Sequence, residues 1–243
     1  MMMKTGTRPP PLIYGILALA VLSRWAMTDP DPLQDYCIAN TTSSSSSMTM
    51  NEIPCINPAS ATASHFATSA LSKPGNTGNR FGFNVTLANT ANLPGLNTMG
   101  LTLARVDIAP QGVVPPHSHP RASEVTTCLK GYIHVGFVDA SNRLYTQILR
   151  PGDSFVFPRG LIHYLYNSDY RTPALAMSGL NSQNPGTQIA SLATFASNPE
   201  IPEQVLEKAF KITGQDIARI HNNLGGSWME FSSQDDKSLL GRI

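Results

Sequence analysis

Charge is scarce in this 243-residue chain: charged residues make up 14% of it, and the formal net charge is +1. Nucleic-acid binding needs a basic face, so this composition argues against a nucleic-acid partner. The apolar run at residues 12–22 is shorter than the about 20 residues that a membrane-spanning helix needs. The sequence also lacks the alternating strand and helix patterns of a parallel α/β fold, and it has no Gly-rich phosphate loop.

The start of the chain has the pattern of a secretory signal peptide, and its residues leave the cleavage point open, with the small-x-small form at Ala18-Leu19-Ala20 as one candidate. Lys4 and Arg8 precede the apolar run at residues 12–22, as in the basic and apolar regions of such leaders. A short buried strand or helix is the alternative interpretation. The pattern predicts a secreted protein without a membrane span.

Cysteine is also rare, with three residues in the whole chain. In the oxidising environment of a secreted protein, Cys37 and Cys55 are the natural disulfide pair, and two free thiols are the alternative. Closing a loop of this size is worth on the order of 3 kcal/mol in the chain-entropy model. The remaining Cys128 has the strand parity of Glu124, so we expect an inward-facing and unreactive thiol.

Polar, loop-forming residues dominate the segment 29–75, which includes a serine run at residues 43–47. The sequons at Asn40 and Asn84 lie in polar surroundings, and we expect them to carry glycans in a secreted chain.

Short runs rich in β-forming residues recur from residue 101 onward, separated by turn residues. Many short strands at regular spacing favour a β-sandwich or barrel. The expected strands are residues 101–108, 124–130, 132–138, 144–150, 154–157, 162–166 and 174–179.

Helical patterns occur only near the end of the chain. Pro202 suits the first position of a helix, and Thr213 with Asp216 resembles a capping box. Gly225 and Gly226 are expected to end the second helix. After residue 226 no periodicity is clear, which leaves docking and disorder both open.

Histidine and glutamate concentrate in one informative stretch, GVVPPHSHPRASEVTTCLKG at residues 112–131. His117 and His119 are two residues apart, so an extended strand points both imidazoles to the same side. Glu124 follows five residues later, and His163 lies in a second strand-like run. Three imidazole nitrogens and one carboxylate oxygen predict a mononuclear metal site. Pro115 and Pro116 lack N–H groups, so the approach to His117 cannot pair fully with a neighbouring strand.

These residues closely resemble the two sequence boxes of the germins and germin-like proteins of the cupin superfamily. The first box, G-x4-H-x-H-x4-E-x6-G, fits residues 112–131, and the second, G-x5-P-x-G-x2-H-x3-N, fits residues 152–167 at every fixed position. The resemblance covers roughly residues 29–226, including NSQNPG at residues 181–186. It implies that the leader is cut just before Asp29 and that an N-terminal disulfide is present.

The resemblance also implies an all-β fold, namely a single cupin or jelly-roll β-barrel with a short C-terminal helical segment. We therefore expect a signal peptide, a loop-rich segment with the disulfide, the barrel, the helices and a tail at residues 1–28, 29–75, 76–197, 198–226 and 227–243. Germins further imply a homo-oligomer, a hexamer by resemblance, located in the extracellular space, apoplast or cell wall. The C-terminal helices would embrace a neighbouring subunit, or pack on their own barrel.

Manganese is the metal that the resemblance implies, held by His117, His119, Glu124 and His163. Imidazole also suits iron and zinc, so the ligand types alone leave these metals open. His65, His134 and His221 lie outside the two boxes and are interpreted as ordinary core or surface residues.

Two activities of germins come with the resemblance: oxalate oxidation and superoxide dismutation. Oxalate-oxidising germins supply asparagine side chains at positions that correspond to Ala104 and Val114, and neither residue can donate a hydrogen bond from its side chain. Oxalate oxidation is therefore disfavoured, and a secreted manganese superoxide dismutase is the leading hypothesis. A non-catalytic extracellular binding, wall-associated or storage cupin is the alternative, whereas no basic cluster supports hydrolysis of nucleotide sugars.

Overall fold

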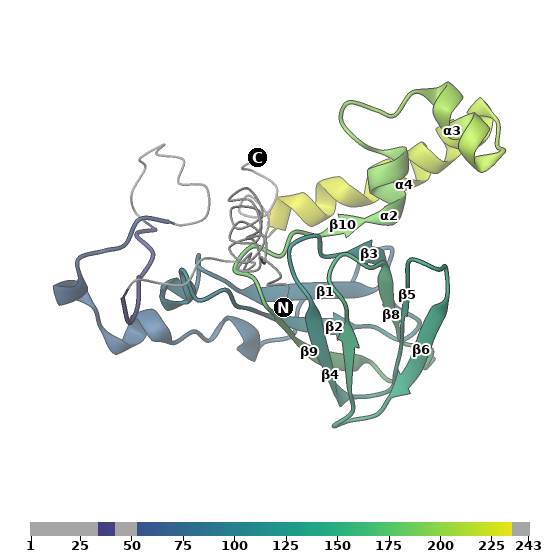
Figure 1. Ribbon diagram of the computed structural model, residues 1–243. Helices are drawn as coiled ribbons and strands as arrows, with labels where there is room; N and C mark the ends of the chain where they lie inside the picture. Colours follow the sequence, from purple (N-terminus) through teal and green to yellow (C-terminus); the bar gives the residue numbers. More distant parts are fainter. Residues whose placement is uncertain (1–33, 42–52, 235–243) are drawn as a thin grey trace, which may run out of the picture.

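Ten strands and several short helices make up the fold of this computed structural model, which describes residues 34–41 and 53–234 (Figure 1). The signal peptide expected at residues 1–28, the serine run at residues 43–47 and the end of the tail, residues 235–243, lie outside the described residues. No helix in the described part of the chain has both the length and the apolar character needed to cross a membrane.

Two five-stranded antiparallel sheets face each other. The first has the order β1-β2-β9-β4-β7, with the bounds Phe83–Ala88, Thr102–Ile108, Ala174–Leu180, Glu124–Lys130 and Ser154–Phe157. The second has the order β10-β3-β8-β5-β6, with the bounds Gln188–Ile189, Val113–Ser118, His163–Tyr166, Ile133–Val138 and Leu144–Leu149. The expected all-β architecture with short C-terminal helices is confirmed.

The seven runs that the sequence marked as strands correspond to β2 and to β4 through β9, with ends that agree to within one residue. β3 contains the extended stretch at His117 that the motif implied, whereas β1 and β10 were not expected. β1 alternates apolar and polar residues in FNVTLA, a usable strand signal that was overlooked, and β10 is only two residues long and carries none. β10 forms because β3 offers it a free edge beside His117.

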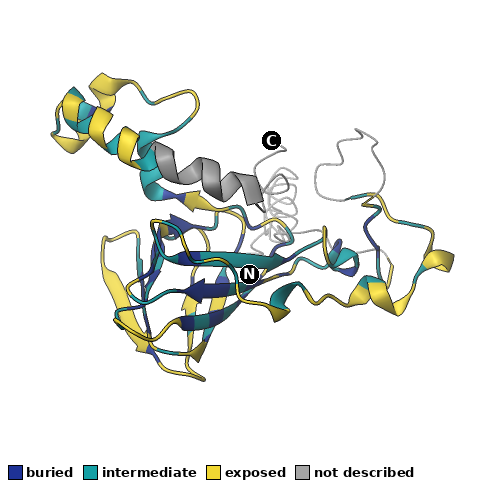
Figure 2. Ribbon diagram, turned by 180° about the vertical axis from the view of Figure 1, so that it is seen from behind, coloured by how far each residue is buried: buried dark blue, intermediate teal, exposed yellow. Residues whose placement is uncertain are grey.

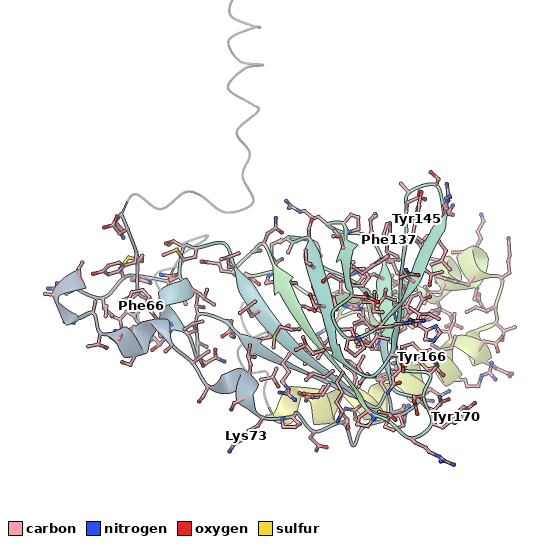
Figure 3. All side chains as sticks on the ribbon, turned by 90° about the horizontal axis from the view of Figure 1, so that it is seen from below. Phe66, Lys73, Phe137, Tyr145, Tyr166 and Tyr170 are labelled. Carbon is pink, nitrogen blue, oxygen red and sulfur yellow. A yellow bond between two sulfur atoms is a disulfide. The ribbon has the colours of Figure 1, made fainter. Side chains whose placement is uncertain are left out.

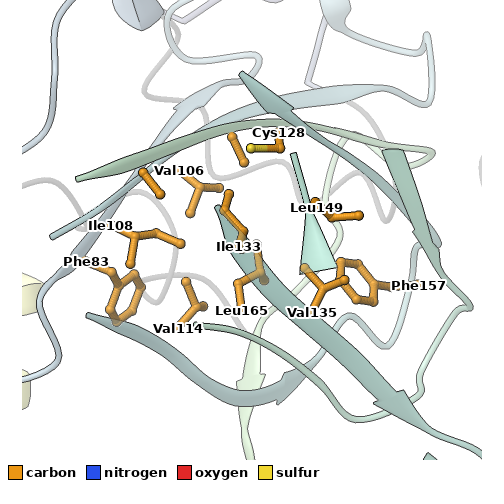
Figure 4. Packing of buried hydrophobic residues seen from close by; sticks show 12 residues of the cluster. Phe83, Val106, Ile108, Val114, Cys128, Ile133, Val135, Leu149, Phe157 and Leu165 are labelled. Carbon is orange, nitrogen blue, oxygen red and sulfur yellow. The ribbon is translucent and has the colours of Figure 1, made fainter. Parts of the chain in front are cut away.

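The apolar core fills the space between the sheets (Figure 4). β9 alternates strictly between buried and partly buried residues, as a strand with one face toward the core should. The largest fully buried apolar side chains in this core are Phe157, Ile108, Ile133, Leu149 and Leu165. In Figure 2 the buried residues are concentrated in the strands, whereas the C-terminal helices are mostly exposed or intermediate.

A loop-rich segment precedes the barrel and is held by covalent and polar contacts. As predicted, Cys37 and Cys55 form a disulfide, and Ala39 pairs with Cys55 in an isolated bridge. The buried amide of Asn97 donates to the sulfur of Cys37 at 3.1 Å and to the carbonyl of Ile53 at 2.6 Å. Four 3-10 turns complete the non-strand part of the segment and the β1–β2 connection: η2 Pro58–Ser60, η3 Ala63–Phe66, η4 Ala70–Ser72 and η5 Pro94–Leu96.

Three helices follow the barrel: α2 Ala190–Phe195, α3 Glu203–Phe210 and α4 Gly214–Gln234. α3 packs on α4 and reaches away from the two sheets, where most of its surface is exposed (Figures 1 and 2). Of the three helices, α3 is the one that lies away from the barrel, whereas α2 contacts β3 and the Asn223 carbonyl in α4 accepts a hydrogen bond from Arg80, just before β1. α2 was not anticipated, because its six residues are too short for a helical period.

The helix boundaries bear out part of the sequence reasoning. The capping box forms, since the Thr213 amide donates to the Asp216 carboxylate at 3.1 Å and the Asp216 amide donates to the Thr213 hydroxyl at 3.3 Å. Pro202 is the N-cap of α3 and not its first residue. The expected stop at Gly225 and Gly226 was wrong, because α4 continues to Gln234. A glycine inside a helix costs only about 1 kcal/mol relative to alanine, which does not suffice to end it.

Candidate metal centre

The four residues of the two sequence boxes come together at one end of the barrel interior. His117 lies in β3 and His119 directly follows this strand, while Glu124 and His163 are the first residues of β4 and β8. Their potential ligand atoms all lie within 4.8 Å of one another. The centroid of the His163 ring is 4.1 Å from that of His117 and 5.3 Å from that of His119.

An irregularity in β3 aims His117 into the barrel. Val114 pairs with Leu165 and His117 pairs with His163, so three steps along β3 match two steps along β8. Side chains three positions apart in a regular strand would point to opposite faces, yet Val114 and His117 are both buried. The extra residue falls at Pro115 and Pro116, which cannot donate to the ladder, in agreement with the interrupted pairing that the sequence predicted.

Backbone carbonyls fix the orientation of all three imidazoles. The Nδ1 atoms of His117, His119 and His163 lie 2.8, 2.6 and 2.9 Å from the carbonyl oxygens of Pro115, Gly186 and Leu161. A carbonyl oxygen only accepts, so each Nδ1 must carry the proton and donate it. In the neutral ring this leaves a lone pair on Nε2, which is the arrangement found for histidines that bind metals.

Glu124 uses its two oxygens differently. Oε1 accepts a hydrogen bond from the Thr126 hydroxyl at 2.6 Å. Oε2 lies 3.0 Å from Nε2 of His119 and 3.4 Å from Nε2 of His163. Despite this proximity, Oε2 of Glu124 and Nε2 of His163 are buried without a hydrogen-bond partner of suitable geometry among the described residues. Buried polar atoms are costly in this state, and a cation between them would satisfy both.

The protonation states of the metal-free cluster are also suited to a cation. Burial would raise the pKa of the Glu124 carboxyl, but its contacts with the His119 and His163 imidazoles outweigh this and hold the pKa well below its usual value. Burial would likewise lower the pKa of His119, but the adjacent Glu124 carboxylate raises it instead. Burial, helped by the neighbouring His163 and His119, lowers the pKa of His117 to about 3. At neutral pH the cluster thus presents an ionised carboxylate and a neutral His117, both suited to a metal.

Access to the cluster is uneven. The side chain of His119 is 11% exposed, whereas those of His163 and Glu124 are 2% and 5% exposed. The Phe157 ring stacks on His163 with centroids 4.4 Å apart and covers it from the core side. Of these three side chains, that of His119 is therefore the most exposed to solvent.

Several residues that shape the site were missed by the sequence reasoning. Thr126 holds Glu124, Ser178 lies 2.7 Å behind Thr126, and Gly186 anchors His119. Thr126 had a usable signal, since it lies two residues after Glu124 and must point to the same face. Gly186 ends the NSQNPG segment that belongs to the resemblance, but nothing in the sequence joined it to His119, and Ser178 had no signal.

The positions relevant to oxalate are apolar and buried. Ala104 is the cross-strand partner of Ser178, and Val114 precedes the two prolines of β3; these residues are 4% and 6% exposed. Neither side chain has a hydrogen-bond donor for a dicarboxylate.

The other histidines lie apart from the cluster and have local partners: the Thr62 amide for His65, the Ser168 hydroxyl for His134 and the Phe195 carbonyl for His221. Cys128 is fully buried, and this burial raises the pKa of its thiol, so it has the environment of an inert core residue.

Two facing antiparallel sheets that enclose three histidines and a glutamate define a cupin, and the family model described as Cupin matches residues 69–218. The chain belongs to the germin-like proteins of this family. It is 57% identical over 212 residues to Germin-like protein subfamily 1 member 1 of Arabidopsis thaliana, covering 87% of this chain and 98% of that relative. Germin-like protein 3-1 of Oryza sativa subsp. japonica is 52% identical over 215 residues, covering 87% and 96%. A solved structure of oxalate oxidase is similar with a TM-score of 0.77 and 39% identity, covering 82% of this chain and 98% of that one.

Proposed function

We propose that this germin-like protein is a secreted manganese superoxide dismutase whose metal is held by His117, His119, Glu124 and His163. The observation that carries the proposal is the buried cluster itself, which has an unpaired carboxylate oxygen and an unpaired imidazole nitrogen. Manganese is preferred because resemblance to germins implies it, and iron or zinc would find the same ligand atoms.

The charge of the site suits a small anion. Three neutral imidazoles and one carboxylate give the protein part a charge of −1, so a divalent ion would leave the centre with about +1. Superoxide is a small monoanion and needs no array of donors to orient it. The partly exposed His119 marks the side from which it would arrive.

The bound ion would supply the one-electron oxidation and reduction that dismutation requires. In the net reaction, two superoxide anions and two protons yield one dioxygen and one hydrogen peroxide, as one anion is oxidised and the other reduced. The residues of this chain hold the ion, keep Glu124 ionised and exclude larger ligands by burial of the cluster.

Oxalate is a poor candidate substrate, although a solved oxalate oxidase is structurally similar. Ala104 and Val114 offer no donor, and each missing hydrogen bond to a charged ligand costs about 1.5–3 kcal/mol. We expect no measurable oxalate oxidation by the manganese-loaded protein, and turnover of oxalate would contradict this part of the proposal.

The test of the proposal compares three forms of the purified protein: stripped by a chelator, reloaded with manganese and reloaded with zinc. Zinc occupies the same kind of ligands but has no redox chemistry, so it restores the filled site without restoring dismutation. Activity only in the manganese form is expected. Activity that survives complete removal of metal rules the proposal out, and manganese-loaded protein that binds a small acid without dismutation favours the non-catalytic alternative.

A ligand substitution gives an independent check. His119→Ala should sharply lower the manganese content because the remaining three ligands lose geometry. Wild-type metal stoichiometry in this variant would contradict the assignment.

Secretion, glycosylation at Asn40 and Asn84, and assembly into a homo-oligomer, a hexamer by resemblance, are part of the same proposal. The Cys37–Cys55 disulfide supports an oxidising location such as the apoplast or cell wall. Exposed apolar side chains on the outer face of the first sheet support assembly: Leu103, Val125 and Val156 are 43%, 47% and 55% exposed. Light scattering of the secreted protein measures its oligomeric mass, and the loss of mass after removal of glycans measures glycosylation.

A further inference from the structure

A pair of buried hydroxyl groups lies directly behind the carboxylate of Glu124. Thr126 on β4 and Ser178 on β9 are cross-strand partners, and they are 0% and 1% exposed. The Thr126 hydroxyl oxygen is 2.6 Å from Oε1 of Glu124 and 2.7 Å from the Ser178 hydroxyl oxygen. Their cross-strand neighbour on β2 is Ala104, so the pair is bordered by an apolar side chain on that side.

The direction of these hydrogen bonds follows from counting protons. Each hydroxyl has one proton to donate, and an ionised carboxylate can only accept. The Thr126 hydroxyl must therefore donate its hydrogen bond to Glu124, and the Ser178 hydroxyl must donate to Thr126. The result is a directed chain from Ser178 through Thr126 to Oε1, whose last bond is charge-assisted and short.

This chain leaves the two oxygens of Glu124 with separate partners. Oε1 is engaged by Thr126, and Oε2 alone faces the imidazoles of His119 and His163. The short bond from Thr126 holds the plane of the carboxylate, so Oε2 is the oxygen that stays turned toward the imidazole nitrogens.

We propose that Thr126, backed by Ser178, is a positioning residue that fixes the Glu124 carboxylate with Oε2 turned toward the metal site. This inference rests on the proposed metal site. Its consequence is that the metal would bind more tightly, because the carboxylate is already held in place.

The chain offers a matched control on the opposite face of the same strand. Thr127 and Ser154 form a hydroxyl pair with oxygens 2.8 Å apart, and this pair is exposed on the outside of the sheet. The two pairs share chemistry and neighbouring positions but differ in burial and in contact with Glu124. Thr127→Val therefore reports the general cost of removing a threonine hydroxyl from β4.

The experiment measures the manganese affinity of the full-length protein by competition with a chelator, together with the electron paramagnetic resonance spectrum of bound Mn(II). We expect Thr126→Val to lower the affinity about 10- to 100-fold, as for other residues that orient metal ligands, and to change the spectrum. Ser178→Ala should have a smaller effect of the same sign, Thr126→Ser should restore both readouts, and Thr127→Val should match the wild type.

The double variant Thr126→Val/Ser178→Ala separates positioning from folding. It removes both hydroxyls, so no unpaired donor stays buried, and thermal stability should recover relative to Thr126→Val. Metal affinity should not recover, and it should equal that of Thr126→Val because Ser178 acts through Thr126. Additive losses of affinity, or wild-type affinity and spectrum in Thr126→Val, would overturn the inference.

These readouts do not depend on turnover. If the variants follow the expected order of affinity while the wild type shows no dismutation, the positioning role stands and the proposed activity fails. If the wild type binds no manganese, the metal assignment and the positioning role both fail.

Discussion

The interior of the barrel has two halves with opposite chemistry. One half, around Ile108, Ile133 and Val135, is apolar and close-packed (Figure 4). The other half holds three imidazoles, a carboxylate and two hydroxyls, all within the same two sheets. Single strands contribute to both: β4 carries Glu124 at one end and Cys128 further along the same face.

The difference between the halves teaches how the fold divides its tasks. The apolar half is stabilised by the removal of its side chains from water, and it needs no ligand to complete its packing. The polar half contains buried atoms without partners, so it is incomplete until a cation binds. We therefore expect substitutions in the apolar half to affect folding, and those in the polar half to affect metal binding.

The largest expected effect is the stabilisation by metal and its loss in Glu124→Gln. Manganese at about 1,000 times its dissociation constant should raise the free energy of unfolding by about 4 kcal/mol. Glu124→Gln keeps the side-chain volume but removes the charge, and should abolish this increment. Chemical denaturation with and without manganese measures both, and the exposed Glu200→Gln is the control.

Ile133→Ala is the complementary test in the apolar half. Ile133 is fully buried, and truncation should lower the free energy of unfolding by about 3 kcal/mol through lost burial and a residual cavity. The folded fraction should still bind manganese with wild-type stoichiometry. A loss of metal binding in folded Ile133→Ala protein would contradict the division between the two halves.

The pH dependence of the metal-free protein gives a smaller effect. The pKa of His117 is lowered to about 3 by burial, so the unfolded chain takes up a proton below about pH 6.5 and the folded chain does not. Stability should therefore fall as the pH drops, by at most about 1.4 kcal/mol per unit.

Other shifted groups of the site do not alter this slope between pH 6.5 and 4.5. The pKa of His119 is raised, so its stabilising effect is fully present below the unfolded value, and the pKa of Glu124 is lowered, so its effect is lost only at more acidic pH. Denaturation midpoints across this window should show the slope in the wild type and a flatter one in His117→Gln. Equal slopes would refute the role of His117.

The smallest expected effect concerns Cys128, which shares a strand face with Glu124 but belongs to the apolar half. Because burial raises the pKa of its thiol, native protein should not react with iodoacetamide at neutral pH, and unfolded protein should react at once. Mass spectrometry of labelled protein measures this, and rapid labelling in the native state would show that this part of the core opens readily.

Much of this architecture could be predicted from the sequence, because strand signals and the two motif boxes are local. The spacing of His117 and His119 predicts a shared face, and the structure brings both beside Glu124 and His163. The contacts that orient the cluster are not local: Gly186, which anchors His119, is 67 residues away along the chain. Such partners depend on strand register, which no single segment specifies.

The end of α4 shows a second kind of limit. Gly225 and Gly226 form a stop signal by propensity, but propensity is a weak prior that context overrides. By contrast, the capping box at Thr213 was predictable because both of its bonds join residues three apart.

The irregularity in β3 determines which face of the strand carries His117. Side chains alternate between the two faces of a regular strand, so residues three apart point to opposite faces. The irregularity at Pro115–Pro116 places Val114 and His117 on the same face instead. Deleting one proline would leave two steps between these residues, as on β8, and a regular strand also places residues two apart on one face, so the imidazole should still enter the barrel. Metal binding that survives in the shortened chain would show that His117 depends on the phase of the strand and not on the extra residue itself.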